Sequence, residues 1–282
     1  MTSVLADPVL RLIAAPMIAS MILAGLVRWI GAGGRGEQIA GAAIAVVFAW
    51  VAAFELGAPL YPPEAADNSL LYLIAAGLAV GMPFDFWRTD AFPAARHIEA
   101  GVALVLGLLA IVWLRGIIDA WTGIILIAWG IVVLRVQFVA TNDAPTSSAL
   151  LALAAAGIGA AAWASGLEGE RNLAFALASA AVGYFLLNWL DPTMRFGATI
   201  VLGALGALLV LAIRLFEATP AIAPALMILG FVFFSDAPAR RLLGRRINRW
   251  RWAMPLFAAL ASILPIGLAA LTAYIGVNFE AV

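Results

Sequence analysis

Residues 147–165 read SSALLALAAAGIGAAAWAS, a run of 19 residues without an ionisable side chain. A helix needs ~20 apolar residues to cross the ~30 Å hydrocarbon core of a bilayer. Small residues recur within this run at four-residue spacing, at Ala156, Ala160 and Ala164, and such spacing lets membrane helices pack closely. The stretch therefore predicts a transmembrane helix inside a helical bundle.

The same pattern extends over the rest of the chain. The sequence is 65% hydrophobic and 11% charged, whereas a soluble domain carries about 25% charged residues. We expect an all-α, polytopic transmembrane helix bundle of about ten spans with short loops, forming a single integral membrane domain over residues 1–282. The predicted spans are 9–30, 38–57, 69–87, 98–116, 120–139, 147–165, 173–190, 196–216, 220–235 and 253–277. Because no basic residue precedes the first run, we interpret it as a membrane helix rather than a signal peptide.

The arginines indicate the orientation of the bundle. All 16 basic residues are Arg, and cytoplasmic loops of membrane proteins collect positive charge. With ten spans and an external N-terminus, the C-terminus is also external. We expect the bundle to be integrated into a bacterial inner (cytoplasmic) membrane. The inner side then holds Arg28, Arg35, Arg88, Arg96, Arg135, Arg195, Arg240, Arg241, Arg245, Arg246, Arg249 and Arg251, and the outer side holds Arg11, Arg115, Arg171 and Arg214.

Several classes of function are disfavoured. The net charge is zero, so nothing draws the whole chain toward nucleic acid. There is no Cys and His97 is the only histidine, which argues against metal, haem and iron–sulfur sites, and we expect no cofactor. Phosphate-binding loops and nucleophile motifs are also absent, so we predict that the protein is not an enzyme.

One group of polar residues is predicted to converge on the inner half of the bundle. Counting residues from the turns near 92 and 118 places Asp85, Glu99 and Arg135 at similar depths, and Arg88 and His97 flank the same region. An unpaired Arg135 would cost at least ~2.5 kcal/mol in hydrocarbon, so we expect it to bond Glu99, Asp85 or both. The five residues could form a substrate-binding site. The alternative is a structural ion pair with interfacial arginines.

Residues 240–251 form the most basic segment. On a helical wheel Arg241, Arg245 and Arg249 share one side, and Trp250 lies with the apolar residues on another. This pattern predicts a short interfacial helix on the cytoplasmic leaflet that binds anionic lipid. The alternative is that these charges only set the topology.

Two functions remain open. No ionisable residue lies near the centre of a predicted span, which disfavours an ion-coupled transporter. Prolines inside the apolar runs, at Pro16, Pro83, Pro224 and Pro265, are typical of kinked helices that can line a cavity. We therefore predict a transporter or facilitator of a small or lipid-like solute. The alternative is a non-catalytic membrane subunit, scaffold or assembly factor with a membrane-protein partner or a second copy of the chain.

Overall fold

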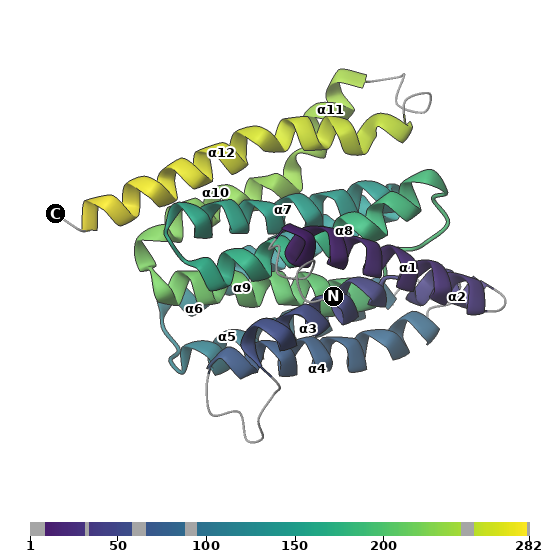
Figure 1. Cartoon of the computed structure of the whole chain (residues 1–282), viewed down its shortest axis with the longest axis horizontal. Helices are drawn as coiled ribbons and strands as arrows, with labels where there is room; N and C mark the ends of the chain where they lie inside the picture. Colours follow the sequence, from purple (N-terminus) through teal and green to yellow (C-terminus); the bar gives the residue numbers. More distant parts are fainter. Residues whose placement is uncertain (1–8, 32–33, 58–65, 88–94, 244–250, 281–282) are drawn as a thin grey trace.

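The computed structural model describes residues 9–31, 34–57, 66–87, 95–243 and 251–280, and every regular element in these ranges is a helix (Figure 1). The elements are η1 (Leu10–Ala14), α1 (Ala15–Ile30), α2 (Arg35–Ile39), α3 (Ala42–Leu56), α4 (Ala66–Trp87), α5 (Ala95–Arg115), α6 (Ala120–Asn142), α7 (Ala144–Ala164), α8 (Glu168–Leu190), η3 (Ile200–Leu205), α9 (Gly206–Ala218), η4 (Pro220–Ile222), α10 (Ala223–Gly230), η5 (Phe231–Phe234), α11 (Asp236–Leu243), η7 (Arg251–Ala253) and α12 (Met254–Glu280).

Nine helical stretches within these ranges are long and apolar enough to cross a membrane. The remaining predicted crossing is α3, which is apolar but only 15 residues long. Two ion pairs show that α3 returns alongside α1. Arg28 Nε lies 3.7 Å from Glu37 Oε1 ahead of α3, and Arg11 Nη2 lies 2.9 Å from Glu55 Oε1 near its end. The prediction of an all-α bundle with about ten spans is confirmed.

The charged residues gather at two opposite ends of the bundle. Arg28 Nη2 lies 2.5 Å from Asp191 Oδ2 at one end, and Arg115 Nε lies 2.5 Å from Glu217 Oε1 at the other. Further contacts at these ends join Arg195 N to the Glu37 carbonyl and Arg214 to Glu170. This arrangement places Arg28 and Arg195 together, away from Arg115 and Arg214, as the sequence predicts. Which end faces the cytoplasm stays a prediction, and we call the Arg28 end the inner end.

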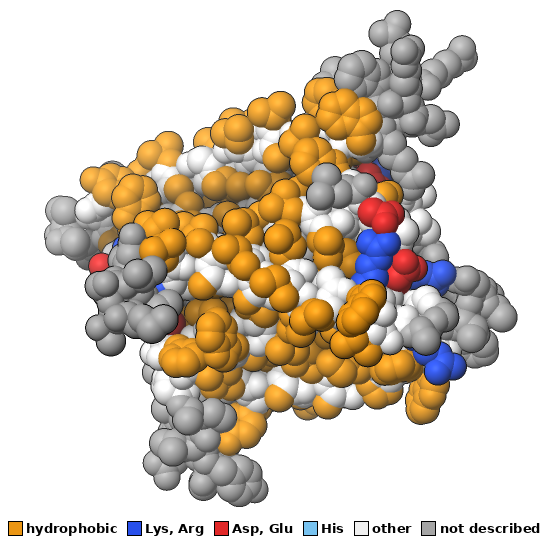
Figure 2. Space-filling view, turned by 45° about the vertical axis from the view of Figure 1, so that its right-hand side comes forward, with side chains coloured by type: hydrophobic (Ala, Val, Ile, Leu, Met, Phe, Trp, Pro, Cys, Tyr) orange, Lys and Arg blue, Asp and Glu red, His pale blue; other side chains and the backbone are white. Residues whose placement is uncertain are grey.

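The centre of the bundle is formed by α7, α8 and the continuous η3–α9 helix. In their apolar segments 72%, 61% and 78% of residues are buried, against 22% in both the first and the last crossing. Figure 1 shows α7 and α8 between α12 on one side and α3–α4 on the other. The outer surface is apolar, and in Figure 2 the charged side chains lie toward the two ends of the visible face. This distribution is that of a bundle immersed in hydrocarbon.

A close backbone contact on the inner half joins α4 to the start of η3. A Cβ added to Gly77 would lie 2.3 Å from the Leu202 carbonyl oxygen, and one added to Gly81 would lie 2.6 Å from Thr199 Cα. Only glycine permits two backbones to approach this closely. The four-residue spacing of Gly77 and Gly81 therefore places η3 directly against α4.

Candidate functional site

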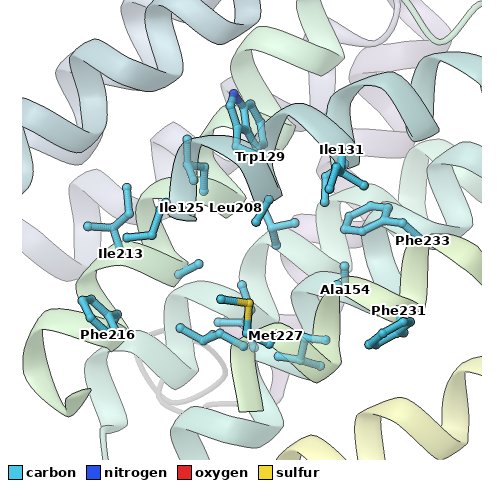
Figure 3. Close-up of a pocket in the computed structure, with 18 of the residues that line it drawn as sticks. Ile125, Trp129, Ile131, Ala154, Leu208, Ile213, Phe216, Met227, Phe231 and Phe233 are labelled. Atoms are coloured by element: carbon cyan, nitrogen blue, oxygen red, sulfur yellow. The ribbon is translucent and has the colours of Figure 1, made fainter. Parts of the chain in front are cut away.

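A cavity of about 440 Å³ lies between α6 and the α10–η5 segment, above a floor made by α7 and α9. We call it the α6–α10 groove. Figure 3 shows its lining side chains around a common space, with Trp129 on one side and Met227 opposite. Its lining includes Trp129, Ile131, Ala154, Leu208, Ile213 and Met227. The volume is in the range of pockets that hold small molecules.

The groove opens sideways, at the level of the membrane. Its floor is covered, since Leu208 is 6% and Ile213 1% exposed, whereas the rim residues Ile131, Met227 and Phe231 are 51%, 44% and 65% exposed. These rim residues lie within apolar spans rather than at the ends of the bundle. The opening therefore faces the hydrocarbon chains of the bilayer.

The lining offers almost no polar atom. The indole nitrogen of Trp129 donates a hydrogen bond to the Ala103 carbonyl on α5, at 3.0 Å, so that this polar atom is already bonded outside the groove. Gly107 makes room for the ring, because a Cβ there would lie 2.4 Å from Trp129 Nε1. Contact between apolar surfaces is consequently the main interaction that the groove offers a ligand.

An ionic cluster stands at the inner end of the groove. Arg135 on α6 donates through Nη2 to Asp236 Oδ1 and through Nε to the Phe233 carbonyl, at 3.2 Å. Arg240 Nε donates to Asp236 Oδ2 at 2.8 Å. The Arg135 guanidinium carbon also lies 5.2 Å from the centre of the Phe234 ring, a cation–π contact. The Asp236 side chain is fully buried, and a buried charge is costly unless it is paired. The two guanidiniums provide this pairing.

A second ionic cluster stands at the opposite end. The almost fully buried Arg115 side chain bonds both Asp119 and Glu217, and its guanidinium carbon lies 5.5 Å from the ring centre of Phe216 in the groove. Asp119 also accepts from Thr122 N at 2.9 Å and so caps α6. Because Arg115 bonds Asp119 so directly, the pKa of the Asp119 carboxyl is held well below its usual range.

The prediction that Arg135 bonds Glu99, Asp85 or both is wrong. Its carboxylate partner is Asp236, and its remaining contacts are with Phe138, Phe233 and Phe234. Distance from a turn relates Arg135 only to the neighbouring helices of its hairpins, α4 and α5. The inner half of α6 also contacts η5 and α11, about a hundred residues away in sequence, through Arg135.

Asp85 has a structural role that the sequence did not reveal. Its Oδ1 accepts from Ala198 N at 2.7 Å, and its Oδ2 accepts from Thr199 N at 2.9 Å and from Thr199 Oγ1 at 2.5 Å. These are the free backbone donors where the η3–α9 helix begins, so Asp85 caps that helix from α4. Gly197 leaves space for the carboxylate, since a Cβ there would lie 2.3 Å from Oδ1.

The other predicted site residues are only partly described. Glu99 is buried at 3% exposure and His97 is exposed, both on α5. Arg88 lies outside the described residues. The substrate-binding role of these residues with Asp85 and Arg135 stays a prediction. Of the predicted lipid-interface residues, Arg241 lies on α11 and is exposed, while Arg245, Arg249 and Trp250 lie outside the described residues.

The groove itself was not predicted, although one feature of the sequence pointed toward it. The span 220–235 is the shortest of the ten predicted from the sequence, and in the structure it consists of η4, α10 and η5 in succession rather than one α-helix. Phe231 through Phe234 form a 3-10 turn within it. Irregular backbone at membrane depth is tolerated where it is buried in protein or lines a cavity.

No known family model matches the chain, and no curated protein matches its sequence.

Proposed function

We propose that this protein binds a lipid-like amphiphile, which enters the α6–α10 groove sideways from the bilayer, and that it facilitates the movement of this molecule in the membrane. The observation that carries the proposal is the groove itself: a deep apolar cavity whose exposed rim lies within the spans. A polar solute would gain little binding free energy from such a lining. An acyl chain gains ~0.8 kcal/mol for each CH₂ that is removed from water.

The length of the groove supports a chain-like ligand. Its lining residues on α6 extend from Trp121 to Val132, which corresponds to ~17 Å at 1.5 Å per residue. Half the hydrocarbon core of a bilayer is ~15 Å thick. The length of the groove therefore matches that of one acyl chain.

The broken wall of the groove supports movement as well as binding. Gly230 joins α10 to the 3-10 turn of η5, and short 3-10 segments within a helix often mark a hinge. The proposed activity is binding and facilitated movement rather than catalysis. Its proposed location is the inner membrane of a bacterium, in keeping with the distribution of arginines.

A matched pair of glycine variants tests the proposal. Gly230 borders the groove and Gly267 lies on the exposed face of α12, and a Cβ added to either has no neighbour within 4 Å. Gly230→Phe should fill the groove without a backbone clash, whereas Gly267→Phe should only project into lipid. The purified chain is reconstituted into vesicles that contain a short-chain fluorescent phospholipid, and transfer between leaflets is measured by chemical quenching.

We expect protein-dependent transfer for the wild type and Gly267→Phe, and a loss of most of it for Gly230→Phe. Equal transfer by both variants would contradict the proposal. A role as a non-catalytic subunit predicts a different result: no transfer by any form, and a partner helix that is released from the purified complex by Gly230→Phe alone.

A further inference from the structure

The two ends of the groove carry opposite surplus charge. At the inner end two guanidiniums, of Arg135 and Arg240, share the single carboxylate of Asp236. At the other end Arg115 bonds two carboxylates, of Asp119 and Glu217. The inner cluster is therefore net positive and the opposite cluster net negative, and an amphiphile in the groove meets a different field at each end.

Donors remain unused at the positive end. Within the described residues no hydrogen bond involves Arg135 Nη1, and Arg240 Nη2 is buried without a partner. Arg241 follows on α11 with an exposed side chain. A buried guanidinium surplus is costly in hydrocarbon unless an anion accompanies it. The planar fork of Arg matches the oxygens of a phosphate group.

The positive cluster is continuous with the groove. Phe233 and Phe234 line the groove, and Arg135 contacts both, through the Phe233 carbonyl and the face of the Phe234 ring. Arg240 lies one helical turn beyond Asp236, up to ~6 Å farther toward the inner end. A ligand whose apolar part fills the groove thus has its polar end beside these arginines.

We infer that the ligand is an anionic phospholipid, with one acyl chain in the α6–α10 groove and its phosphate against Arg135, Arg240 and Arg241. This inference rests on the proposed function and specifies the class and direction of the ligand. Binding in the reverse direction would bring the phosphate to Asp119 and Glu217, where like charges repel it. A zwitterionic lipid with the same chains lacks the net charge that the surplus guanidinium requires.

Native mass spectrometry of the full chain tests this inference. The detergent-purified protein is titrated with phosphatidylglycerol and phosphatidylcholine of identical acyl chains, and the ratio of the two bound lipids is measured. The wild type should prefer phosphatidylglycerol. Arg240→Gln should reduce that preference on the order of fivefold, the contribution of one arginine near an anionic lipid. Arg241→Gln, which removes an exposed side chain, should reduce it in the same direction and serves as the second variant if Arg240→Gln does not fold.

Arg171→Gln is the matched control, because it removes the same charge on α8 near the opposite end. It should leave the ratio unchanged. If Arg240→Gln and Arg241→Gln both keep the wild-type ratio, or if Arg171→Gln lowers it equally, the inference is wrong.

Failure of the proposed function gives another pattern. In that case Gly230→Phe would bind as much of both lipids as the wild type does, whatever the ratio between them. Loss of both lipids in Gly230→Phe together with an unchanged ratio in the arginine variants would retain the groove as a lipid site and overturn only the anionic phospholipid. A dimer of the chain that dissociates in Gly230→Phe, without a change in bound lipid, would assign the groove to a second copy and overturn both.

Discussion

The continuous η3–α9 helix makes two very different contacts. Its first half, η3, lies against α4 with glycine backbones in contact and with Asp85 bonded to its free donors. Its second half, α9, forms the floor of the α6–α10 groove, where no side chain from the opposite wall fills the space. The comparison shows how one helix can be fixed at one end and remain accessible at the other. The packing of η3 against α4 fixes the position of α9, and the unfilled space above α9 leaves room for a ligand.

The largest effect is expected at the backbone contact between α4 and η3. In Gly77→Ala the new methyl carbon would lie 2.3 Å from the Leu202 carbonyl oxygen, which belongs to the backbone and cannot move aside without shifting η3. We expect a loss of at least ~1–3 kcal/mol in the free energy of unfolding. Thermal unfolding in detergent measures it. Gly101→Ala on α5 is the control, because a Cβ there has no neighbour within 4 Å. Equal stability of the two variants would show that α4 and η3 are not in contact.

Removal of the Asp85 cap should have the next largest effect. Asp85→Ala leaves the buried Ala198 and Thr199 amides without their acceptor, at a cost of ~1–3 kcal/mol for an unsatisfied buried donor. Asp85→Asn keeps one acceptor oxygen and should lose less. Thermal unfolding ranks the two variants. If Asp85→Ala is as stable as the wild type but abolishes lipid transfer, the side chain belongs to a functional site, as the sequence first suggested.

A smaller effect is expected behind the groove. Gly107→Ala places a methyl group 2.4 Å from Trp129 Nε1, and the indole is a side chain that can move. The indole should lose its hydrogen bond to the Ala103 carbonyl and shift toward the groove. The free energy of unfolding should fall by ~0.5–1.5 kcal/mol. Native mass spectrometry should show fewer bound lipids. Unchanged lipid binding would mean that Trp129 does not limit the width of the groove.

The smallest effect concerns acid. Arg115 lowers the pKa of Asp119, so Asp119 stabilises the folded state above pH ~4 and loses this contribution as the pH falls below that value. Asp119→Asn retains a capping side chain but removes the charge. Its deficit in melting temperature relative to the wild type should therefore be present at pH 7 and should shrink at pH 3. A deficit that is the same at both pH values would assign the effect to the cap rather than to the charge.

Sequence periodicity and composition were sufficient for the class of fold. Apolar runs of span length predicted the crossings, and among the described residues Arg28 and Arg195 lie at the end opposite to Arg115 and Arg214, as predicted. The predicted break between the spans 98–116 and 120–139 is formed in the structure by Gly116, with φ +65°, and by the Asp119 cap. Apolar runs and turn residues act over short stretches of the chain, so they can be recognised in one sequence.

The site depends on contacts that a single sequence does not contain. Arg135 meets Asp236 from 101 residues away, and Asp85 caps a helix 113 residues later. Counting depth from the nearest turns could compare Arg135 only with its neighbours in the hairpins. The groove results from a separation between α6 and α10, and no residue motif encodes that separation. Only the short length of the predicted span 220–235 pointed toward it.

Both proposals require that an acyl chain occupies the α6–α10 groove. A phospholipid with a photoactivatable group in its acyl chain, cross-linked to the protein in vesicles and located by mass spectrometry, tests this most directly. The covered floor residues Leu208 and Ile213 can be labelled only from within the groove, whereas Leu264 and Leu268 on α12 are 69% and 45% exposed. The floor residues should be labelled in the wild type, and this labelling should be lost in Gly230→Phe and retained in Gly267→Phe. Labelling confined to α12 and other exposed faces, with none on the floor, would contradict it.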